Sequence, residues 1–314
     1  MSSRRQILSL IGAACAAGFL PPPVAAEVLR SRELSSADVA SLFTAFGRTH
    51  RMPAELGRWL KDPAQQVIPP YQVFDNVWYV GLRWVAAYAL KTEDGVIVID
   101  TTHEPFAQHF IRNLETVGID LKDIRWVLMT HGHFDHVGGA ARLKPLAPNA
   151  RFVMSRRGWE EAFHDARGER GFAMLDQPDV TLKDGETVSA GSTVVTLLET
   201  PGHTWGTSSY LYNVKDGSKT RRAVTVGGLG LNAISGPEQL DAYMASMKRL
   251  ASRELAVEVD LTAHPFSIGM TEMIPDIEKH SPGGPHPLAD RPAFCRRLQA
   301  LAGGAQARKK ELFG

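Results

Sequence analysis

The chain has 314 residues, of which 44% are hydrophobic and 22% are charged, and its formal net charge is +1 at pH 7. These values are typical of a globular protein with a substantial core, and they exclude a low-complexity or fibrous chain. No block of basic residues precedes the short run at 308–310, so the charge pattern does not favour a nucleic-acid partner.

The first 26 residues have the composition of an export signal. Two arginines near the start precede an apolar run over residues 7–20, and small residues follow up to Ala26. The stretch SRRQIL at 3–8 resembles a twin-arginine signal. We therefore expect a periplasmic protein with a signal over 1–26 and a mature chain over 27–314. The apolar run is too short for a permanent anchor, so no membrane association is expected after the signal is removed.

Helical and strand patterns follow one another along the mature chain. A helical leader is expected over 35–63, capped by Ser35 or Ser36. Apolar, β-branched segments at 71–82 and 84–100 are predicted as antiparallel strands. The later predicted elements are a helix over about 104–117, a strand over 124–130, a helix from 136, a strand over 151–155, a helix over 156–166, strands around 180–188, 192–200, 208–214 and 221–228, a helix over about 237–252, a strand over 259–264 and a helix from about 289.

This order of elements predicts an α/β fold of layered sheets covered by helices. The stretch at 280–288, rich in proline and glycine, is interpreted as a loop, and no linker divides the mature chain, so one domain is expected. Cys15 belongs to the predicted signal and Cys295 is then alone, which excludes an internal disulfide. The core must therefore stabilise the exported protein by itself.

Four potential metal ligands fall within six residues of the stretch THGHFDHVGG: His131, His133, Asp135 and His136. Imidazole nitrogen and carboxylate oxygen are suited to zinc and similar ions. The stretch follows a predicted strand, and on such a loop His131 and His133 can converge on one ion while Asp135 and His136 turn towards a second. A structural zinc site is the alternative, but such sites are usually rich in cysteine.

A catalytic metal site needs further ligands, and two histidines have a similar context. His203 in TPGHTWG and His264 in TAHPF each follow an apolar, β-rich run and precede a loop. Asp100 also ends a predicted strand, where it either orients a ligand or belongs to a turn. His280 and His286 have no supporting pattern and are interpreted as surface residues.

Together these motifs resemble the metallo-β-lactamase superfamily, from NVWYVG and GVIVIDTT through THGHFDHVGG and TPGHTWG to TAHP. The resemblance implies a four-layer αβ/βα sandwich with two zinc ions between its sheets. It assigns His131, His133 and His203 to the first zinc, and Asp135, His136 and His264 to the second. It also implies that Asp100 orients one of these ligands.

One missing residue distinguishes among the groups of this superfamily. Glyoxalase-II-like, lactonase-like and phosphodiesterase-like members usually have an aspartate that bridges both metals after a late strand, and this chain has Gly228 there. This combination resembles the subclass-three metallo-β-lactamases. Their usual serines for the substrate carboxylate are absent from the following loop, where only Asn232 or Ser235 could serve. Trp205 replaces a usual proline, which places a bulky ring near the expected substrate pocket.

The sequence thus favours a zinc hydrolase that acts on a small molecule. In the preferred hypothesis hydroxide, available at neutral pH through zinc, attacks a β-lactam amide while Asp135 orients it. A lactone or another ester is the alternative substrate, and a zinc-binding periplasmic protein without catalysis is a second alternative. The chain has no Gly-x-Ser-x-Gly elbow, Cys-x-x-Cys pair or phosphate-binding loop that would indicate other chemistry.

Overall fold

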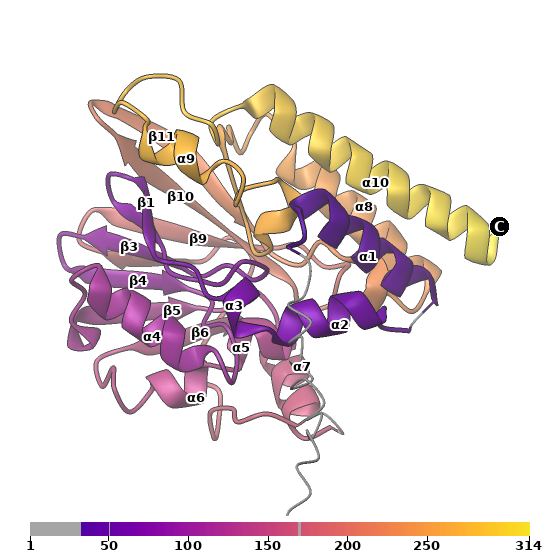
Figure 1. The fold of residues 1–314 in the computed structure, drawn as a ribbon, viewed down its shortest axis with the longest axis horizontal. Coiled ribbons are helices and arrows are strands. Elements are labelled where there is room, and N and C mark those ends of the chain that lie inside the picture. Colours follow the sequence, from indigo (N-terminus) through magenta and orange to yellow (C-terminus); the bar gives the residue numbers. More distant parts are fainter. Residues whose placement is uncertain (1–32, 50, 169–170) are drawn as a thin grey trace, which may run out of the picture.

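The computed structural model describes residues 33–49, 51–168 and 171–314 (Figure 1). The predicted signal over 1–26 lies outside these residues. Within the described ranges, no helix combines the length and the apolar character needed to cross a membrane.

Two β-sheets form the centre of the fold. The first has seven strands in chain order, β1 (Tyr71–Phe74), β2 (Val77–Tyr79), β3 (Tyr88–Thr92), β4 (Gly95–Ile99), β5 (Ile124–Leu128), β6 (Arg151–Ser155) and β7 (Val180–Leu182). The second has five, in the order β12 (Val259–Thr262), β11 (Lys219–Val226), β10 (Ser208–Asp216), β9 (Thr193–Glu199) and β8 (Thr187–Ala190). Strands β4 to β7 are mutually parallel, as are β11 and β12.

Ten helices of the described residues accompany the two sheets. They are α1 (Ser36–Thr49), α2 (Ala54–Lys61), α3 (Pro63–Gln66), α4 (Ala107–Thr116), α5 (Phe134–Val137), α6 (Ala140–Leu143), α7 (Arg156–Ala166), α8 (Pro237–Leu250), α9 (Ile274–Glu278) and α10 (Arg291–Phe313). Three single 3-10 turns are η1 (Leu121–Asp123), η2 (Leu231–Ala233) and η3 (Pro265–Ser267). Figure 1 shows α4 and α6 beside the first sheet and α8 and α10 on the opposite side, beyond the second sheet.

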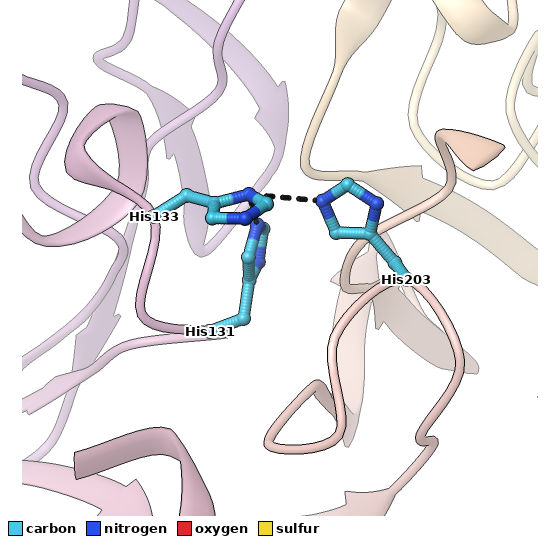
Figure 2. A group of neighbouring side chains, drawn as sticks. All are labelled: His131, His133 and His203. Atoms are coloured by element: carbon cyan, nitrogen blue, oxygen red, sulfur yellow. Dashed lines mark hydrogen bonds between the residues drawn. The ribbon is translucent and has the colours of Figure 1, made fainter. Parts of the chain in front are cut away.

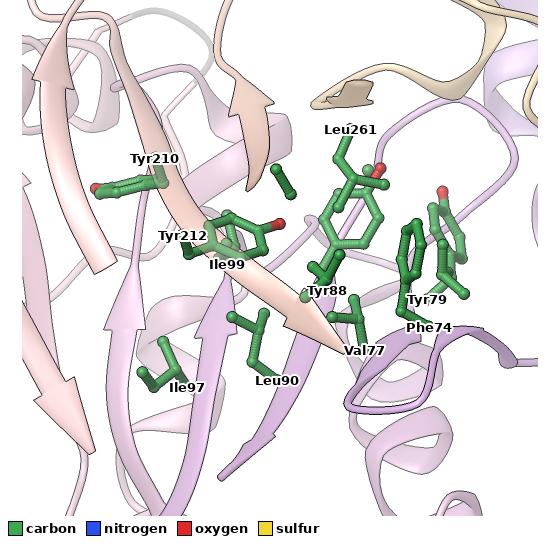
Figure 3. Packing of buried hydrophobic residues seen from close by; sticks show 14 of the residues in the cluster. Phe74, Val77, Tyr79, Tyr88, Leu90, Ile97, Ile99, Tyr210, Tyr212 and Leu261 are labelled. Atoms are coloured by element: carbon green, nitrogen blue, oxygen red, sulfur yellow. The ribbon is translucent and has the colours of Figure 1, made fainter. Parts of the chain in front are cut away.

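The largest core cluster lies between the two sheets. Ile97 and Ile99 of β4 face Tyr210 and Tyr212 of β10, and all four side chains are buried (Figure 3). Separate clusters join the first sheet to α4, α6 and α7, and the second sheet to α8 and α10. The predicted α/β sandwich of four layers is therefore confirmed.

Several predicted boundaries differ from the structure. The leader is divided into three helices, and Pro53 precedes the second of them. Ser35 caps the first, because its hydroxyl accepts the Asp38 N–H. The expected helix from 136 is two short helices, because the chain approaches Thr101 so closely that a Cβ on Gly139 would lie 2.2 Å from the Thr101 carbonyl oxygen.

Two further expectations are corrected by the fold. The strands predicted around 180–188 belong to different sheets, with β7 at the edge of one and β8 at the edge of the other. The prediction that His286 is a surface residue is wrong: the side chain is 6% exposed, and its Nε2 lies 2.8 Å from the carbonyl oxygen of Val73. A backbone carbonyl carries no side-chain signal, so the sequence could not reveal this partner.

The C-terminal helix is attached to the second sheet by a bidentate ion pair. Arg297 of α10 donates to both carboxylate oxygens of Asp260 in β12, at 2.7 and 2.5 Å. Burial raises the pKa of Asp260, and the nearby guanidinium opposes this shift. The pair therefore keeps the carboxylate charged in an environment that disfavours charge.

Replacing Arg297 by leucine is expected to leave the Asp260 charge without its partner and to lower the free energy of unfolding by about 2–4 kcal/mol at pH 8. The loss should be smaller at pH 5, because the raised pKa lets Asp260 take up a proton as the pH falls. Urea denaturation at both pH values measures the effect, with Arg296→Leu at the exposed neighbouring position as control. Equal stability of the two variants at pH 8 would contradict the argument.

Candidate metal centre

The candidate ligands lie where strand ends of the two sheets meet. His131 follows β5, and Asp100 follows the parallel strand β4. His203 follows β9 and His264 follows β12; these strands run in the same direction, because β9 and β11 are each antiparallel to β10 and β12 is parallel to β11. The two edges are joined by a hydrogen bond of 2.8 Å from the Ser208 N–H to the Thr130 carbonyl.

All six predicted ligands come together in two groups. The potential ligand atoms within each group lie within 4.8 Å of one another, and the groups are His131, His133 and His203, and Asp135, His136 and His264. The division is the one implied by the sequence resemblance. That these side chains hold metal ions stays a prediction.

In the first group, three ring nitrogens converge. His133 Nδ1 lies 3.1 Å from His131 Nε2 and 3.0 Å from His203 Nε2, as Figure 2 shows. Tetrahedral zinc with bonds of 2.0–2.1 Å holds neighbouring ligand nitrogens about 3.3 Å apart. The spacing in this group is close to that value.

The outer hydrogen bonds leave lone pairs pointing inward. The His203 Nδ1–H donates to the Gly230 carbonyl at 2.6 Å, so Nε2 carries the lone pair. His131 Nδ1 lies 3.1 Å from the Thr130 hydroxyl, which itself donates to Asp100, so His131 Nε2 also carries a lone pair. His133 Nδ1 can give a proton to only one of them. In the other contact two unprotonated nitrogens face each other, and a cation bound between them would remove the repulsion of their lone pairs.

The protonation of the histidines also suits metal binding. Burial lowers the pKa of His131 well below its usual value, that of His133 to about 3, and those of His203 and His264 to about 4. These rings are therefore neutral at pH 7, and the neutral ring is the form that binds a metal.

The second group combines two rings with a carboxylate. His136 Nε2 lies 3.1 Å from Asp135 Oδ2 and 3.3 Å from His264 Nε2. The His264 Nδ1–H donates to the Trp84 carbonyl at 2.8 Å, which leaves Nε2 free to bind an ion. Burial alone would raise the pKa of Asp135, but His136 and His264 outweigh it and hold this pKa below its usual range.

Two buried carboxylates make the second group attractive to a cation. Burial disfavours a charge on His136, but Asp135 and Asp100 overcome this effect and raise its pKa to about 10. A divalent ion at Nε2 would replace the proton that these carboxylates now favour. The donor atoms of both groups thus fit two metal ions, and their chemistry is that of zinc ligands.

Asp100 connects the two groups. Its Oδ2 accepts from His136 Nδ1 at 2.8 Å and from the Thr130 hydroxyl at 2.9 Å, and its Oδ1 accepts from the Thr130 N–H at 2.7 Å. The backbone here is in the left-handed region, with φ +60° at Asp100 and +58° at Thr102. The branched Thr102 resists this conformation, so the turn stores strain at the site. This strained turn presents Asp100 to His136 directly and to His131 through Thr130.

Gly228 is required by the packing of a ligand. A Cβ at this position would lie 2.0 Å from Cδ2 of the His203 ring. The ring therefore occupies the space in which a side chain of residue 228 would begin. An aspartate cannot stand here unless His203 moves.

The residues predicted to line the substrate pocket lie in two different places. Trp205 is 41% exposed, and its ring centroid lies 5.6 Å from Arg157 Cζ. The Asn232 amide lies over Gly230, and the Ser235 hydroxyl donates to Gln239 Oε1 at 3.3 Å. Asn232 and Ser235 line a groove of about 460 Å³ beside the end of α10.

Four residues that support the candidate ligands were not predicted from the sequence: Thr130, Trp84, Gly230 and Glu161. Thr130 directly precedes His131, and this position was the only feature of the sequence that could have indicated its role. Trp84 and Gly230 act through backbone carbonyls, which have no side-chain signature. Glu161 accepts the Gly206 N–H at 3.0 Å, and the sequence separates these residues by 45 positions.

Comparisons with known proteins agree with this geometry. The family model described as "Metallo-beta-lactamase superfamily" matches residues 80–216. The fold matches BJP-1, a subclass B3 metallo-β-lactamase of Bradyrhizobium japonicum, with a TM-score of 0.68 and 26% identity over 78% of this chain and 96% of that one. This protein has the metallo-β-lactamase fold.

Two more relatives show the breadth of the similarity. MEM-A1, a subclass B3 metallo-β-lactamase from a soil metagenome library, matches this protein with a TM-score of 0.66 and 25% identity over 77% of this chain and 95% of that one. A hydroxyacylglutathione hydrolase of Bradyrhizobium sp. (strain ORS 278) is 36% identical over 109 residues, which are 35% of this chain and 36% of that protein. The match thus spans about a third of this curated relative's length.

Replacing Asp100 by asparagine is expected to weaken metal binding about 10- to 100-fold, because the His136 ring loses its charged acceptor. Competition with a chromophoric chelator measures the affinity. Asp94→Asn, at an exposed turn, is the matched control and should bind metal normally. Unchanged affinity in Asp100→Asn would show that the carboxylate does not organise the ligands.

Replacing Gly228 by alanine is expected to displace the His203 ring and to remove one bound metal ion per chain. Metal content after dialysis gives the stoichiometry, and circular dichroism checks that the variant is folded. Gly303→Ala is the control, because a Cβ there meets no atom within 4 Å. Retention of the full metal content by Gly228→Ala would contradict the proposed contact.

Proposed function

We propose that this protein is a dinuclear zinc hydrolase of the metallo-β-lactamase superfamily that opens the amide bond of β-lactams in the periplasm. The observation that carries the proposal is the arrangement of six potential ligands in two groups, with the His203 ring packed against Gly228 where a bridging aspartate would begin. The similarity to BJP-1 and MEM-A1, which covers most of the chain, supports the same substrate class. The periplasmic location rests on the export signal predicted in the sequence.

The first group would hold one zinc ion and the second group the other. Bound zinc supplies a Lewis acid that polarises a carbonyl, and it makes hydroxide available at neutral pH. His131, His133 and His203 keep their rings neutral through burial, and outer hydrogen bonds to Thr130 and Gly230 fix the directions of the His131 and His203 rings.

Asp135 has a further part in the proposed reaction. Its carboxylate is ionised at neutral pH because His136 and His264 hold its pKa low against the effect of burial. An ionised carboxylate accepts hydrogen bonds only, so it can orient the attacking water. Neither group contains a serine or cysteine, which agrees with direct attack by water rather than by a protein nucleophile.

An ester or lactone is the second candidate substrate. The similarity to a hydroxyacylglutathione hydrolase favours it, as does the engagement of the Ser235 hydroxyl with Gln239. The packing of His203 against Gly228 favours the β-lactam, because the aspartate usual in ester-cleaving members is excluded from that position.

The zinc-loaded protein is expected to hydrolyse a chromogenic cephalosporin, and a chelator should abolish the activity. His131→Ala and Asp135→Ala should each lose at least about a hundredfold in kcat/KM, because each removes a ligand of one ion. His164→Ala, which changes an exposed histidine, is the control and should remain active.

Three results would contradict parts of the proposal. Full activity in His131→Ala or Asp135→Ala would exclude the metal mechanism. Hydrolysis of an acyl lactone but not of the cephalosporin, by protein with two zinc ions, would favour the ester-cleaving alternative. A protein that holds two zinc ions and hydrolyses neither compound would be a zinc-binding protein without this catalysis.

A further inference from the structure

One of the two side chains expected to hold a substrate carboxylate already has a hydrogen-bond partner, and the other lies against the backbone. The Ser235 hydroxyl and backbone N–H both donate to Gln239 Oε1, at 3.3 and 3.1 Å. The Asn232 amide oxygen lies so near Gly230 that a Cβ there would be 2.2 Å away. Ser235 is thus committed to Gln239, and an anionic substrate could instead contact a cationic group in the surroundings of the candidate ligands.

Helix α7 is packed against both loops that carry the first ligand group. Gly132, between His131 and His133, approaches α7 so closely that a Cβ would lie 2.5 Å from the Ala162 nitrogen. Gly206, three residues after His203, would with a Cβ lie 2.3 Å from the Gly158 nitrogen. The first turn of α7 is therefore fixed beside this part of the metal centre.

Glu161 of α7 fixes the loop after His203. Its carboxylate accepts the N–H groups of Gly206 and Trp205 and the hydroxyl of Thr204. The Ser155 hydroxyl donates to the Gly206 carbonyl at 3.1 Å on the other side of the same loop. The backbone that carries Trp205 is thus held from several directions, although its ring is exposed.

The fixed Trp205 ring carries a cation. Arg157, on the first turn of α7, places Cζ 5.6 Å from the ring centroid, which is within the range of a cation–π interaction. Among the residues that the structure describes, Arg157 has no carboxylate partner. A guanidinium that contacts an aromatic ring through its face keeps its in-plane N–H groups for a second partner.

We propose that Arg157, supported by Trp205, binds the carboxylate of the substrate at the side of the metal centre formed by His133 and His203. Guanidinium and carboxylate pair through two parallel hydrogen bonds, and the aromatic ring limits the orientations of the side chain. This assignment gives the site a preference for anionic substrates. It rests on the proposed hydrolase function.

The test removes the negative charge of the substrate and, separately, the positive charge of Arg157, and compares the effects on KM. A chromogenic cephalosporin and its methyl ester are hydrolysed by zinc-loaded wild type, Arg157→Gln and Arg156→Gln. Arg156 is the exposed neighbour in the same turn, so its variant removes the same charge from the helix. Arg157→Gln should raise KM for the free carboxylate about tenfold with kcat within about twofold, and should leave KM for the methyl ester unchanged.

A second prediction concerns the Trp205 ring. Trp205→Ala should raise KM for the free carboxylate by a smaller factor than Arg157→Gln, because the cation remains but loses its support. Trp205→Phe should restore part of the affinity, since phenylalanine keeps a ring face. Equal KM values for the free carboxylate in wild type, Arg157→Gln and Arg156→Gln would overturn the proposal, as would an equal rise for both substrates.

A binding measurement separates this proposal from the proposed function. The hydrolysed cephalosporin, which carries its original carboxylate and the one formed by ring opening, is titrated against zinc-loaded protein beside its monomethyl ester, in which only the original carboxylate is blocked, and binding is followed by tryptophan fluorescence. Binding of the free carboxylate that weakens about tenfold in Arg157→Gln but not in Arg156→Gln supports the subsite even if no substrate is turned over. Binding that is the same in all three proteins overturns it, whatever the hydrolytic activity.

Discussion

The arrangement of the metal centre depends on the buried carboxylate of Asp100. It fixes the direction of the His136 ring by a direct hydrogen bond and that of His131 through the Thr130 hydroxyl. A single group therefore sets ring orientation in both ligand groups. The left-handed backbone at Asp100 and Thr102 is the cost of this geometry, and the parallel pairing of β4 with β5 brings the turn to the loop that it organises.

Close backbone approaches surround the ligands on the other side. Gly132 and Gly206 allow α7 to contact two ligand loops, and Gly228 makes room for the His203 ring. Each of these positions lacks a Cβ because another group already occupies the space. The histidines are consequently held by packing as well as by hydrogen bonds, so their ring directions do not depend on a metal alone.

The charge distribution divides the centre into two unlike halves. The first group consists of neutral rings, whereas the second contains Asp135 and lies against Asp100. A substrate carbonyl and an attacking water place different demands on their surroundings, and two unlike sites can meet both. Trp205, two residues after His203, contacts Arg157, and we have proposed that this pair binds an anionic part of the substrate.

The sequence by itself determined the α/β fold class and the six candidate ligands, and the resemblance to the metallo-β-lactamase superfamily implied their division into two groups. The ligands are encoded locally, by residue type and by position after apolar strands, and this is why THGHFDHVGG, His203 and His264 could be read from the chain. Tertiary structure decided the burial of His286, the separation of β7 from β8, and the partners of Arg157 and Glu161. These depend on backbone carbonyls and on contacts between segments far apart in the chain, and neither leaves a mark in the local pattern of residues.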